Sequence, residues 1–356
     1  MNSSLSQLSA PSVCYCLLTS HECPIPRPEL MGVPGETVLT FFPKTRSQTP
    51  GAFVIQAGAE PSPGYRLTRP RGRGGFAEVW EAESPHGCPV ALKFMPSSNT
   101  ATTARELRSI QSLQTLDHPY LVKTNGVWSV PGYIVIDMEL GDATLLDLML
   151  LYHNDLNQQI PSAELCAHMW QTAEALDFLN SRRHTRDGRK VGFQHGDIKP
   201  NNILLFNGSA KLTDYGLATP THGPSTPCPR HGTREFAPPE VFQGYLTDTS
   251  DQFSLAVTYC VLRTGRFPFP PPPGSDMPKS FVRPYADLAG LLPDEQTLLL
   301  KALSPVPQAR FGTCGELAQG LLAVHGMTMN RSESGSWRAI TDHDSDVKRR
   351  IAARGR

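Results

Sequence analysis

The alternation of apolar and polar residues divides the middle of the chain into a strand-forming part and a helix-forming part. From Tyr65 to about Trp80 the pattern predicts a strand, a glycine-rich loop and a second strand, and residues 90–94 form a continuous apolar run typical of a buried strand. Two more strands are expected around Val127 and over residues 133–138. Strands followed by helices predict an α+β protein, with a small β-rich lobe beside a larger helical lobe.

Apolar residues at helical spacing predict the helices. Over residues 101–116 they recur every three positions and form one stripe, at Ala104, Leu107, Ile110, Leu113 and Leu116. From Thr144 onward the chain is predicted to be mainly helical, and residues 162–181 give the clearest pattern. Ser162 is the expected N-cap of that helix, because its side-chain oxygen can accept a hydrogen bond from the first turn.

Proline marks the regions where these patterns stop. The chain has 33 prolines among 356 residues, about 9%, where roughly 5% is usual. Nine of them lie in residues 1–64 and thirteen in residues 219–284. We therefore expect an irregular Pro- and Ser-rich leader over 1–64, whose apolar stretch 52–55 docks on the domain that follows. The domain itself is expected over 65–325, with lobes 65–141 and 142–325, before a polar, mildly basic tail over 326–356.

Charge and cysteine content limit the class of protein and its location. The 33 basic and 33 acidic residues cancel, which argues against attachment to nucleic acid or anionic lipid by bulk charge. No apolar run approaches the roughly 18 residues of a membrane span, and the N-terminus lacks the charged and apolar regions of a signal peptide. The eight cysteines show no metal-ligand or disulfide spacing, so reduced thiols and a cytoplasmic location are expected. Met31 is an alternative first residue.

A glycine-rich hairpin and a buried lysine are the first candidates for chemistry. Gly72, Gly74 and Gly75 lie between two predicted strands, where backbone amides can bind phosphate oxygens, although such hairpins are also common without this role. Lys93 ends the buried apolar strand and needs a partner, because burying a lone ammonium group costs several kcal/mol. Glu106 on the following helix is the candidate partner. The alternative is a lysine whose ammonium reaches solvent at the strand end.

The segment 194–205 contains the strongest functional pattern. It holds Asp197, Lys199 and Asn202, and Asp214 follows Asp197 by seventeen residues, after a short predicted strand over 210–213. These residues supply a base, a cation that neutralises phosphate, and two hard oxygen ligands for Mg²⁺. Their order and spacing together predict phosphoryl transfer.

With these motifs the chain resembles the eukaryotic-type (Hanks-type) serine/threonine protein kinases, with a bacterial-like character. Residues 195–202 resemble the HRD-x-x-x-x-N catalytic loop, residues 214–216 the DFG motif, residues 90–93 the VAIK strand, and Glu106 the glutamate of helix αC. Residues 232–240 resemble the end of an activation segment. Asp251 corresponds to the buried aspartate of helix αF, and Arg310 to the arginine that pairs with Glu240. The resemblance covers about residues 65–322 and implies the bilobal protein-kinase fold.

The resemblance implies an enzyme of signal transduction that transfers the γ-phosphate of ATP to Ser and Thr hydroxyls of protein substrates, with Mg²⁺ as the metal. In that mechanism Lys93 holds the α- and β-phosphates and is oriented by Glu106, Asp197 is the base, Lys199 neutralises the γ-phosphoryl group, and Asn202 and Asp214 hold Mg²⁺. Thr233 is expected to face Asp197 and Lys199. Nucleotide contacts are expected from the three loop glycines and from Val79, Ala91, Lys93, Met138, Glu139, Leu140 and Leu204.

Some positions depart from the family pattern or leave alternatives open. Gly196 replaces the arginine of HRD, which makes the chain a non-RD type and argues against activation by phosphorylation of the activation segment. Met138 is the expected gatekeeper, with Ile136 as the alternative. A nucleotide-binding, pseudokinase-like scaffold is the runner-up function, and it would be favoured if a member of the catalytic set were missing; none is. A small-molecule kinase is a further alternative, against which Lys199 and the segment 232–240 argue.

Overall fold

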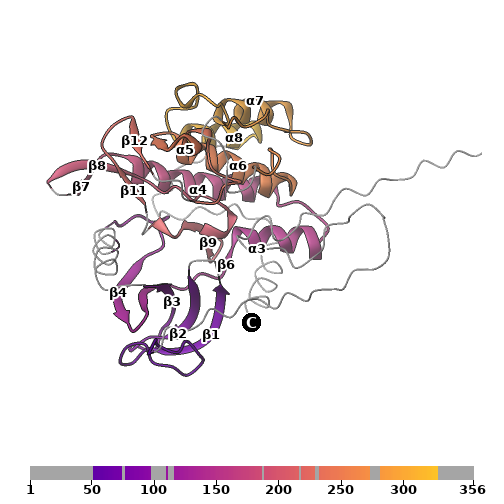
Figure 1. The fold of residues 1–356 in the computed structure, drawn as a ribbon. Coiled ribbons are helices and arrows are strands. Elements are labelled where there is room, and N and C mark those ends of the chain that lie inside the picture. Colours follow the sequence, from indigo (N-terminus) through magenta and orange to yellow (C-terminus); the bar gives the residue numbers. More distant parts are fainter. Residues whose placement is uncertain are drawn as a thin grey trace, which may run out of the picture.

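The described residues form a sheet lobe and a helical lobe, which lie one above the other in Figure 1. The computed structural model describes residues 51–73, 77–97, 110, 116–186, 188–215, 218–228, 232–272 and 281–327. Glu106, with most of the helix predicted over 101–116, lies outside these residues, as do Gly74, Gly75 and Gly216.

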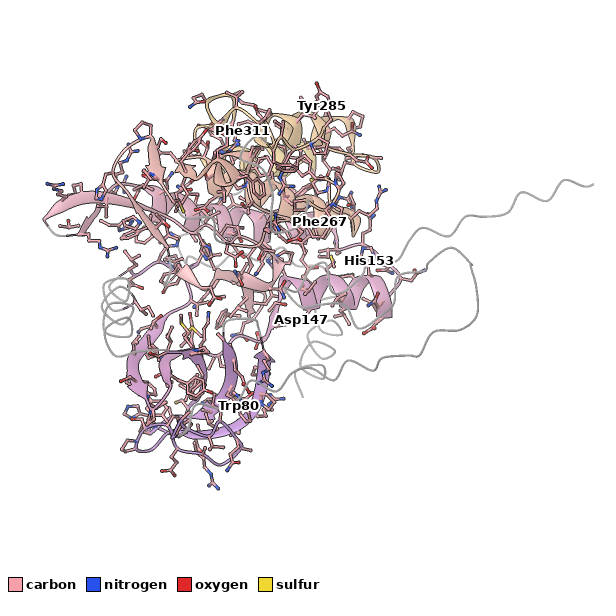
Figure 2. All side chains as sticks on the ribbon, viewed as in Figure 1. Trp80, Asp147, His153, Phe267, Tyr285 and Phe311 are labelled. Carbon is pink, nitrogen blue, oxygen red and sulfur yellow. The ribbon has the colours of Figure 1, made fainter. Side chains whose placement is uncertain are left out.

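The sheet lobe consists of five antiparallel strands in the order β1-β2-β3-β5-β4. Their bounds are β1 Arg66–Arg73, β2 Glu78–Glu83, β3 Pro89–Pro96, β4 Thr124–Val130 and β5 Tyr133–Glu139, which confirms the strands predicted from the sequence. Because successive side chains of a strand point to opposite faces, β3 contributes to two apolar layers. Leu92 and Phe94 belong to the layer on one face with Trp80, while Ala91 belongs to the layer on the other face; Trp80 is labelled in Figure 2.

Residues ahead of β1 cover the layer that contains Leu92 and Phe94. Phe53 and Ile55 pack against it, and the Phe53 ring stacks on Phe94 with ring centroids 6.0 Å apart. The Phe53 backbone N–H donates to the Pro131 carbonyl at 2.7 Å. The prediction that residues 52–55 dock on the following domain is therefore confirmed.

The helical lobe is built around α6, of which 13 of the 15 residues are buried. The helices are α3 Leu145–Leu150, α4 Ser162–Asn180, α5 Pro239–Gln243, α6 Ser250–Thr264, α7 Pro293–Ala302 and α8 Cys314–Val324, with a π-helical turn at Leu151–Asp155 and 3₁₀ turns at Pro200–Asn202 and Pro307–Ala309. The predicted N-cap of α4 is wrong by one position. Pro161 has an extended ψ of 134° and caps the helix, and its carbonyl accepts the first helical hydrogen bond from Leu165 at 2.9 Å, so Ser162 is already the first helical residue.

Short strands make up the rest of the β-structure in the described residues. They form a sheet of order β10-β9-β6, a sheet of order β11-β8-β7 and the pair β12-β13. Their bounds are β6 Ala143–Thr144, β7 His184–Arg186, β8 Arg189–Gln194, β9 Ile203–Phe206, β10 Ser209–Leu212, β11 Thr219–Thr221, β12 Ser225–Pro227 and β13 Tyr245–Thr247. The insert 182–193 contains the β7–β8 hairpin, which projects at the left of Figure 1. The chain leaves β8 directly into residues 195–202, so this hairpin leads into the predicted catalytic loop.

Candidate active site

A buried carboxylate of α6 holds the loop that follows β8. Asp251 accepts the backbone N–H of His195 at 2.7 Å and that of Gly196 at 2.8 Å. Burial raises the pKa of the Asp251 carboxyl, and the nearby His195 and the two N–H bonds oppose that rise. One side chain thus fixes the backbone immediately before Asp197.

The His195 ring links this loop to the chain that enters Asp214. Its Nδ1 accepts the backbone N–H of Asp197 at 3.2 Å, and its Nε2 lies 2.7 Å from the Thr213 carbonyl oxygen. Because a carbonyl oxygen only accepts hydrogen bonds, Nε2 is the nitrogen that donates to Thr213. The sequence indicated no role for this histidine beyond its place in the motif, because both of its partners are backbone groups.

Asp197, Lys199, Asn202 and Thr233 meet at one point of the junction. The Lys199 Nζ lies 3.0 Å from the Asp197 carboxylate and donates to the Thr233 hydroxyl at 2.6 Å. The Thr233 N–H donates to the other oxygen of the Asp197 carboxylate at 2.7 Å. The Asn202 amide nitrogen donates to the Asp197 carbonyl at 2.8 Å and to its carboxylate at 3.2 Å. Both oxygens of the Asp197 carboxylate are therefore fixed in direction.

These contacts decide the ionisation of Asp197. Burial acts to raise the pKa of its carboxyl, but the Lys199 charge and the Thr233 hydrogen bonds outweigh burial and hold the pKa below its ordinary value. The group is consequently an anion at neutral pH. An ionised carboxylate can accept a hydrogen bond from a hydroxyl group placed against it.

Lys93 and Asp214 form the second charged pair of the site. Lys93 projects from β3, and its Nζ lies 2.5 Å from the Asp214 carboxylate, which follows β10. Burial acts to raise the pKa of Asp214, but the Lys93 charge and hydrogen bond outweigh it and lower the pKa. The backbone of Asp214 has φ of +66°, a conformation uncommon for residues other than glycine. The predicted partner Glu106 lies outside the described residues, so the Lys93–Glu106 pairing stays a prediction.

Apolar side chains form a patch beside these charges. Ala91 and Met138 are buried in one cluster, against which Val79, Leu140 and Leu204 pack. The register of β3 and β5 pairs Ala91 with Met138, so both point to this face. The structure thus brings together the five apolar residues predicted to contact a nucleotide.

Glu139 and Gly72 are two further residues that the sequence predicted to contact a nucleotide. The Glu139 carboxylate accepts from Lys211 Nζ at 2.7 Å and from the Lys123 backbone N–H at 2.8 Å. This carboxylate is therefore occupied by protein groups, and the Glu139 backbone N–H donates to the Lys123 carbonyl at 3.1 Å. Gly72 lies on β1 opposite Val79, one residue before the end of the strand.

A buried ion pair supports the segment that carries Thr233. Arg310 donates from two nitrogens to the two oxygens of Glu240, at 2.7 and 2.8 Å, and neither side chain is exposed. Such bidentate pairing fixes direction as well as distance. The pairing expected from the sequence is confirmed.

Comparison with known proteins agrees with this architecture. The family model for the protein kinase domain matches residues 65–324. The serine/threonine-protein kinase PknF of Mycobacterium tuberculosis is 29% identical over 275 residues, which cover 72% of this chain and 56% of that protein. The CBL-interacting protein kinase 4 of rice is 30% identical over 282 residues, covering 76% of this chain and 58% of that protein. PknD of M. tuberculosis is 28% identical over 295 residues, covering 76% of this chain and 40% of that protein.

The chain therefore belongs to the protein kinase family, and its resemblance to bacterial Hanks-type serine/threonine kinases is confirmed. The match spans about half the length of the curated relatives, 56% of PknF and 58% of the rice kinase. In the part of the chain that the structure describes, no helix has both the length and the apolar character of a membrane span.

Proposed function

We propose that the protein is a serine/threonine protein kinase that transfers the γ-phosphate of ATP to hydroxyl groups of protein substrates. The observation that carries the proposal is the convergence of two lysine–aspartate pairs, Lys93 with Asp214 and Lys199 with Asp197, at the junction of the lobes. The first pair joins β3 to the chain that follows β10, and the second lies within the loop that follows β8. Phosphoryl transfer depends mainly on such positioned charges.

Asp197 is proposed as the base that orients the substrate hydroxyl and accepts its proton. Its carboxylate is ionised and held by Thr233 and Asn202. Lys199, which contacts both Asp197 and Thr233, neutralises charge on the γ-phosphoryl group during in-line transfer. Lys93 binds the α- and β-phosphates once nucleotide draws it from Asp214.

Asn202 and Asp214 are proposed as the Mg²⁺ ligands, and their chemistry fits a hard divalent cation. Asn202 binds Asp197 through its amide nitrogen, which directs the amide oxygen elsewhere. The Lys93 bond uses one oxygen of the Asp214 carboxylate. Mg²⁺ commonly binds one or two protein ligands together with substrate phosphates, and when bound it supplies charge neutralisation to those phosphates.

The adenine is proposed to lie between Val79 and Ala91 on one side and Leu204 on the other, with Met138 as the gatekeeper. The pairing of Ala91 with Met138 supports Met138, because it places both side chains at the same depth of the apolar cluster. Ile136 pairs with Lys93. It therefore lies two residues from Met138, on the side of the proposed phosphate-binding lysine. The hinge is then residues 139–141.

We further propose a cytoplasmic location and protein substrates with Ser or Thr acceptors. The five described cysteines are free thiols, as expected of a reducing compartment. Thr233 and Lys199 meet beside the base, and Lys199 favours the short Ser and Thr acceptors over Tyr.

The test is γ-phosphate transfer by the purified full chain, to itself and to a generic basic protein, with Mg²⁺ and with EDTA. Asp197→Asn retains the shape of the side chain but lacks the base, and it should reduce the rate by about 10²- to 10⁴-fold. A Mg²⁺-dependent signal in the wild type that the variant lacks supports the kinase. Nucleotide binding without transfer above the Asp197→Asn background contradicts it and favours the scaffold.

A further inference from the structure

Strand β1 carries an irregularity at Arg71, at the edge of the proposed nucleotide site. Its pairing with β2 runs from Pro70 opposite Trp80 to Gly72 opposite Val79, so Arg71 is an extra residue in β1 at a shift of the register. Bulges of this kind change the direction of a side chain and are frequent beside active sites. The bulge at Arg71 therefore sets the direction in which the Arg71 side chain points.

The Arg71 guanidinium reaches across to the proposed hinge. Its Nη2 donates to the Gly141 carbonyl at 3.0 Å and to the Asp142 carbonyl at 3.1 Å. Its Nη1 lies 3.6 Å from the Glu81 carboxylate on β2, and the Arg71 side chain is 18% exposed. A flat guanidinium suits this arrangement, because it presents several donors in fixed directions.

Each end of this bridge lies next to a surface of the proposed adenine pocket. On β1 the next residue, Gly72, pairs with Val79, which belongs to the apolar cluster. At the other end, a Cβ on Gly141 would lie 3.2 Å from Leu204, so the hinge backbone rests directly on the opposite surface. Arg71 consequently connects the Val79 side of the pocket to the Leu204 side.

We propose that Arg71 is a positioning residue of the nucleotide site, which fastens the glycine-rich strand to the hinge and slows nucleotide release. The inference rests on the proposed kinase function. The two hydrogen bonds limit how far β1 can move from residues 141–142, and a nucleotide held between Val79 and Leu204 leaves only when that gap widens. Loss of the bonds therefore accelerates dissociation, without removing any group that contacts the transferred phosphate.

Arg69 provides a matched control. It lies on the same strand and binds the same Glu81 carboxylate, with Nε at 2.9 Å and Nη2 at 2.7 Å. Its contacts stay within the sheet, whereas those of Arg71 cross to the hinge. Arg69→Leu thus removes the same charge from the same strand and leaves the bridge in place.

The experiment measures binding and release of a fluorescent ADP (the N-methylanthraniloyl derivative) with Mg²⁺ by the full chain, using equilibrium titration and stopped flow. Arg71→Leu should raise the Kd and the dissociation rate about tenfold, as expected for two hydrogen bonds of modest net strength. Arg71→Lys, with the same charge but no fork of donors, should fall between. The KM for ATP should rise with the dissociation rate, the KM for the protein substrate should stay unchanged, and kcat should not fall.

The outcomes separate this inference from the function on which it rests. Equal Kd and equal dissociation rate in wild type and Arg71→Leu overturn the role of Arg71 alone. An equal effect of Arg69→Leu also overturns it, since charge or the Glu81 contact would then explain the change. If the wild type binds no nucleotide, the proposed function fails and the inference fails with it. Thermal unfolding of each variant checks folding, and Arg71→Lys serves as the test if Arg71→Leu is unstable.

Discussion

At the scale of single residues, Gly196 and Gly232 have backbone conformations that favour glycine. The φ of Gly196 is +76° and that of Gly232 is +85°, a region that other residues rarely adopt. A Cβ on Gly232 would lie 2.3 Å from the Gly196 carbonyl oxygen. The catalytic loop and the chain before Thr233 therefore pack backbone to backbone at this point, in an arrangement that needs glycine at Gly232.

Asp137 is a buried acidic residue whose surroundings change the pKa of its carboxyl. It lies on β5 next to Met138, is 3% exposed, and accepts hydrogen bonds from the Tyr65 hydroxyl at 2.9 Å and the Asn125 amide at 3.2 Å. Burial raises the pKa of its carboxyl, and these two bonds only partly oppose the rise. The charged form is therefore less favourable in the folded protein than in the unfolded chain.

This shift predicts a pH-dependent effect of Asp137→Asn. The folded-state pKa lies above the unfolded value, so the wild type loses stability as pH rises from about 4 through the folded-state pKa. Asparagine keeps the shape and does not titrate; its oxygen can accept from the Asn125 amide, and its NH₂ group can donate to the Tyr65 hydroxyl oxygen. The melting temperature of the variant relative to wild type should therefore rise between pH 4 and pH 7. A difference that is constant over this range, measured by thermal unfolding at several pH values, contradicts the assignment.

At the scale of elements, the activation segment is held by backbone pairing. Strand β11 pairs with β8, which leads into the catalytic loop, and β12 pairs with β13. The Cys228 N–H donates to the Gly244 carbonyl at 2.9 Å, and the buried Arg283 donates to the carbonyls of Arg234 and Ala237. These backbone contacts fix the position of the described parts of the segment.

We therefore predict that activity does not depend on phosphorylation of this segment. Alanine at Thr219, Thr221, Ser225 or Thr226 should change kcat/KM by no more than about threefold, because the pairing of β11 and β12 uses backbone groups and not these hydroxyl groups, and phosphatase treatment should leave activity unchanged. Thr221 is also a poor acceptor, since it is 1% exposed. A large loss at one of these sites that an acidic residue restores, in assays of the purified variants, would show that the segment is switched by phosphate.

At the scale of the whole molecule, the folded unit is longer than the family match. The match begins at residue 65, but Phe53 and Ile55 already pack on the outer layer of the sheet. The Trp128 indole N–H also donates to the Pro61 carbonyl at 3.3 Å. Residues 51–64 thus cover an apolar face that a chain starting at Tyr65 would expose.

Removal of the Phe53 ring tests this coverage. Phe53→Ala should lower the free energy of unfolding by about 2 kcal/mol, less than for a fully buried phenylalanine because the ring is only partly buried. Val54→Ala is the control, since Val54 is 48% exposed and should cost no more than about 0.5 kcal/mol. Urea unfolding of the full chain measures both values. Equal losses in the two variants would contradict a specific role of Phe53.

The sequence predicted strands and one buried ion pair correctly, but it did not predict a helix cap or hydrogen bonds to the backbone. Strands β3 and β5 were predictable because apolar runs of that length suit a buried strand, and the pair of Glu240 with Arg310 was implied by the resemblance to protein kinases. The N-cap of α4 was not predictable, because Pro161 and Ser162 are adjacent and both residue types are common at the start of a helix. The hydrogen bonds of the His195 ring could not be predicted, because their partners are backbone groups, which every residue type carries.

The sequence by itself determined the family, the two-lobed α+β architecture and the identity of the chemical groups, because local periodicity and motif spacing are properties of the chain. Tertiary structure decided several contacts that nothing in the sequence indicated. It placed Lys93 against Asp214 across 121 positions of sequence, joined the His195 ring to the Thr213 carbonyl, and directed Arg71 at the hinge through a one-residue bulge. Such contacts depend on register and packing between distant segments, and an alternation pattern does not encode a one-residue shift in register.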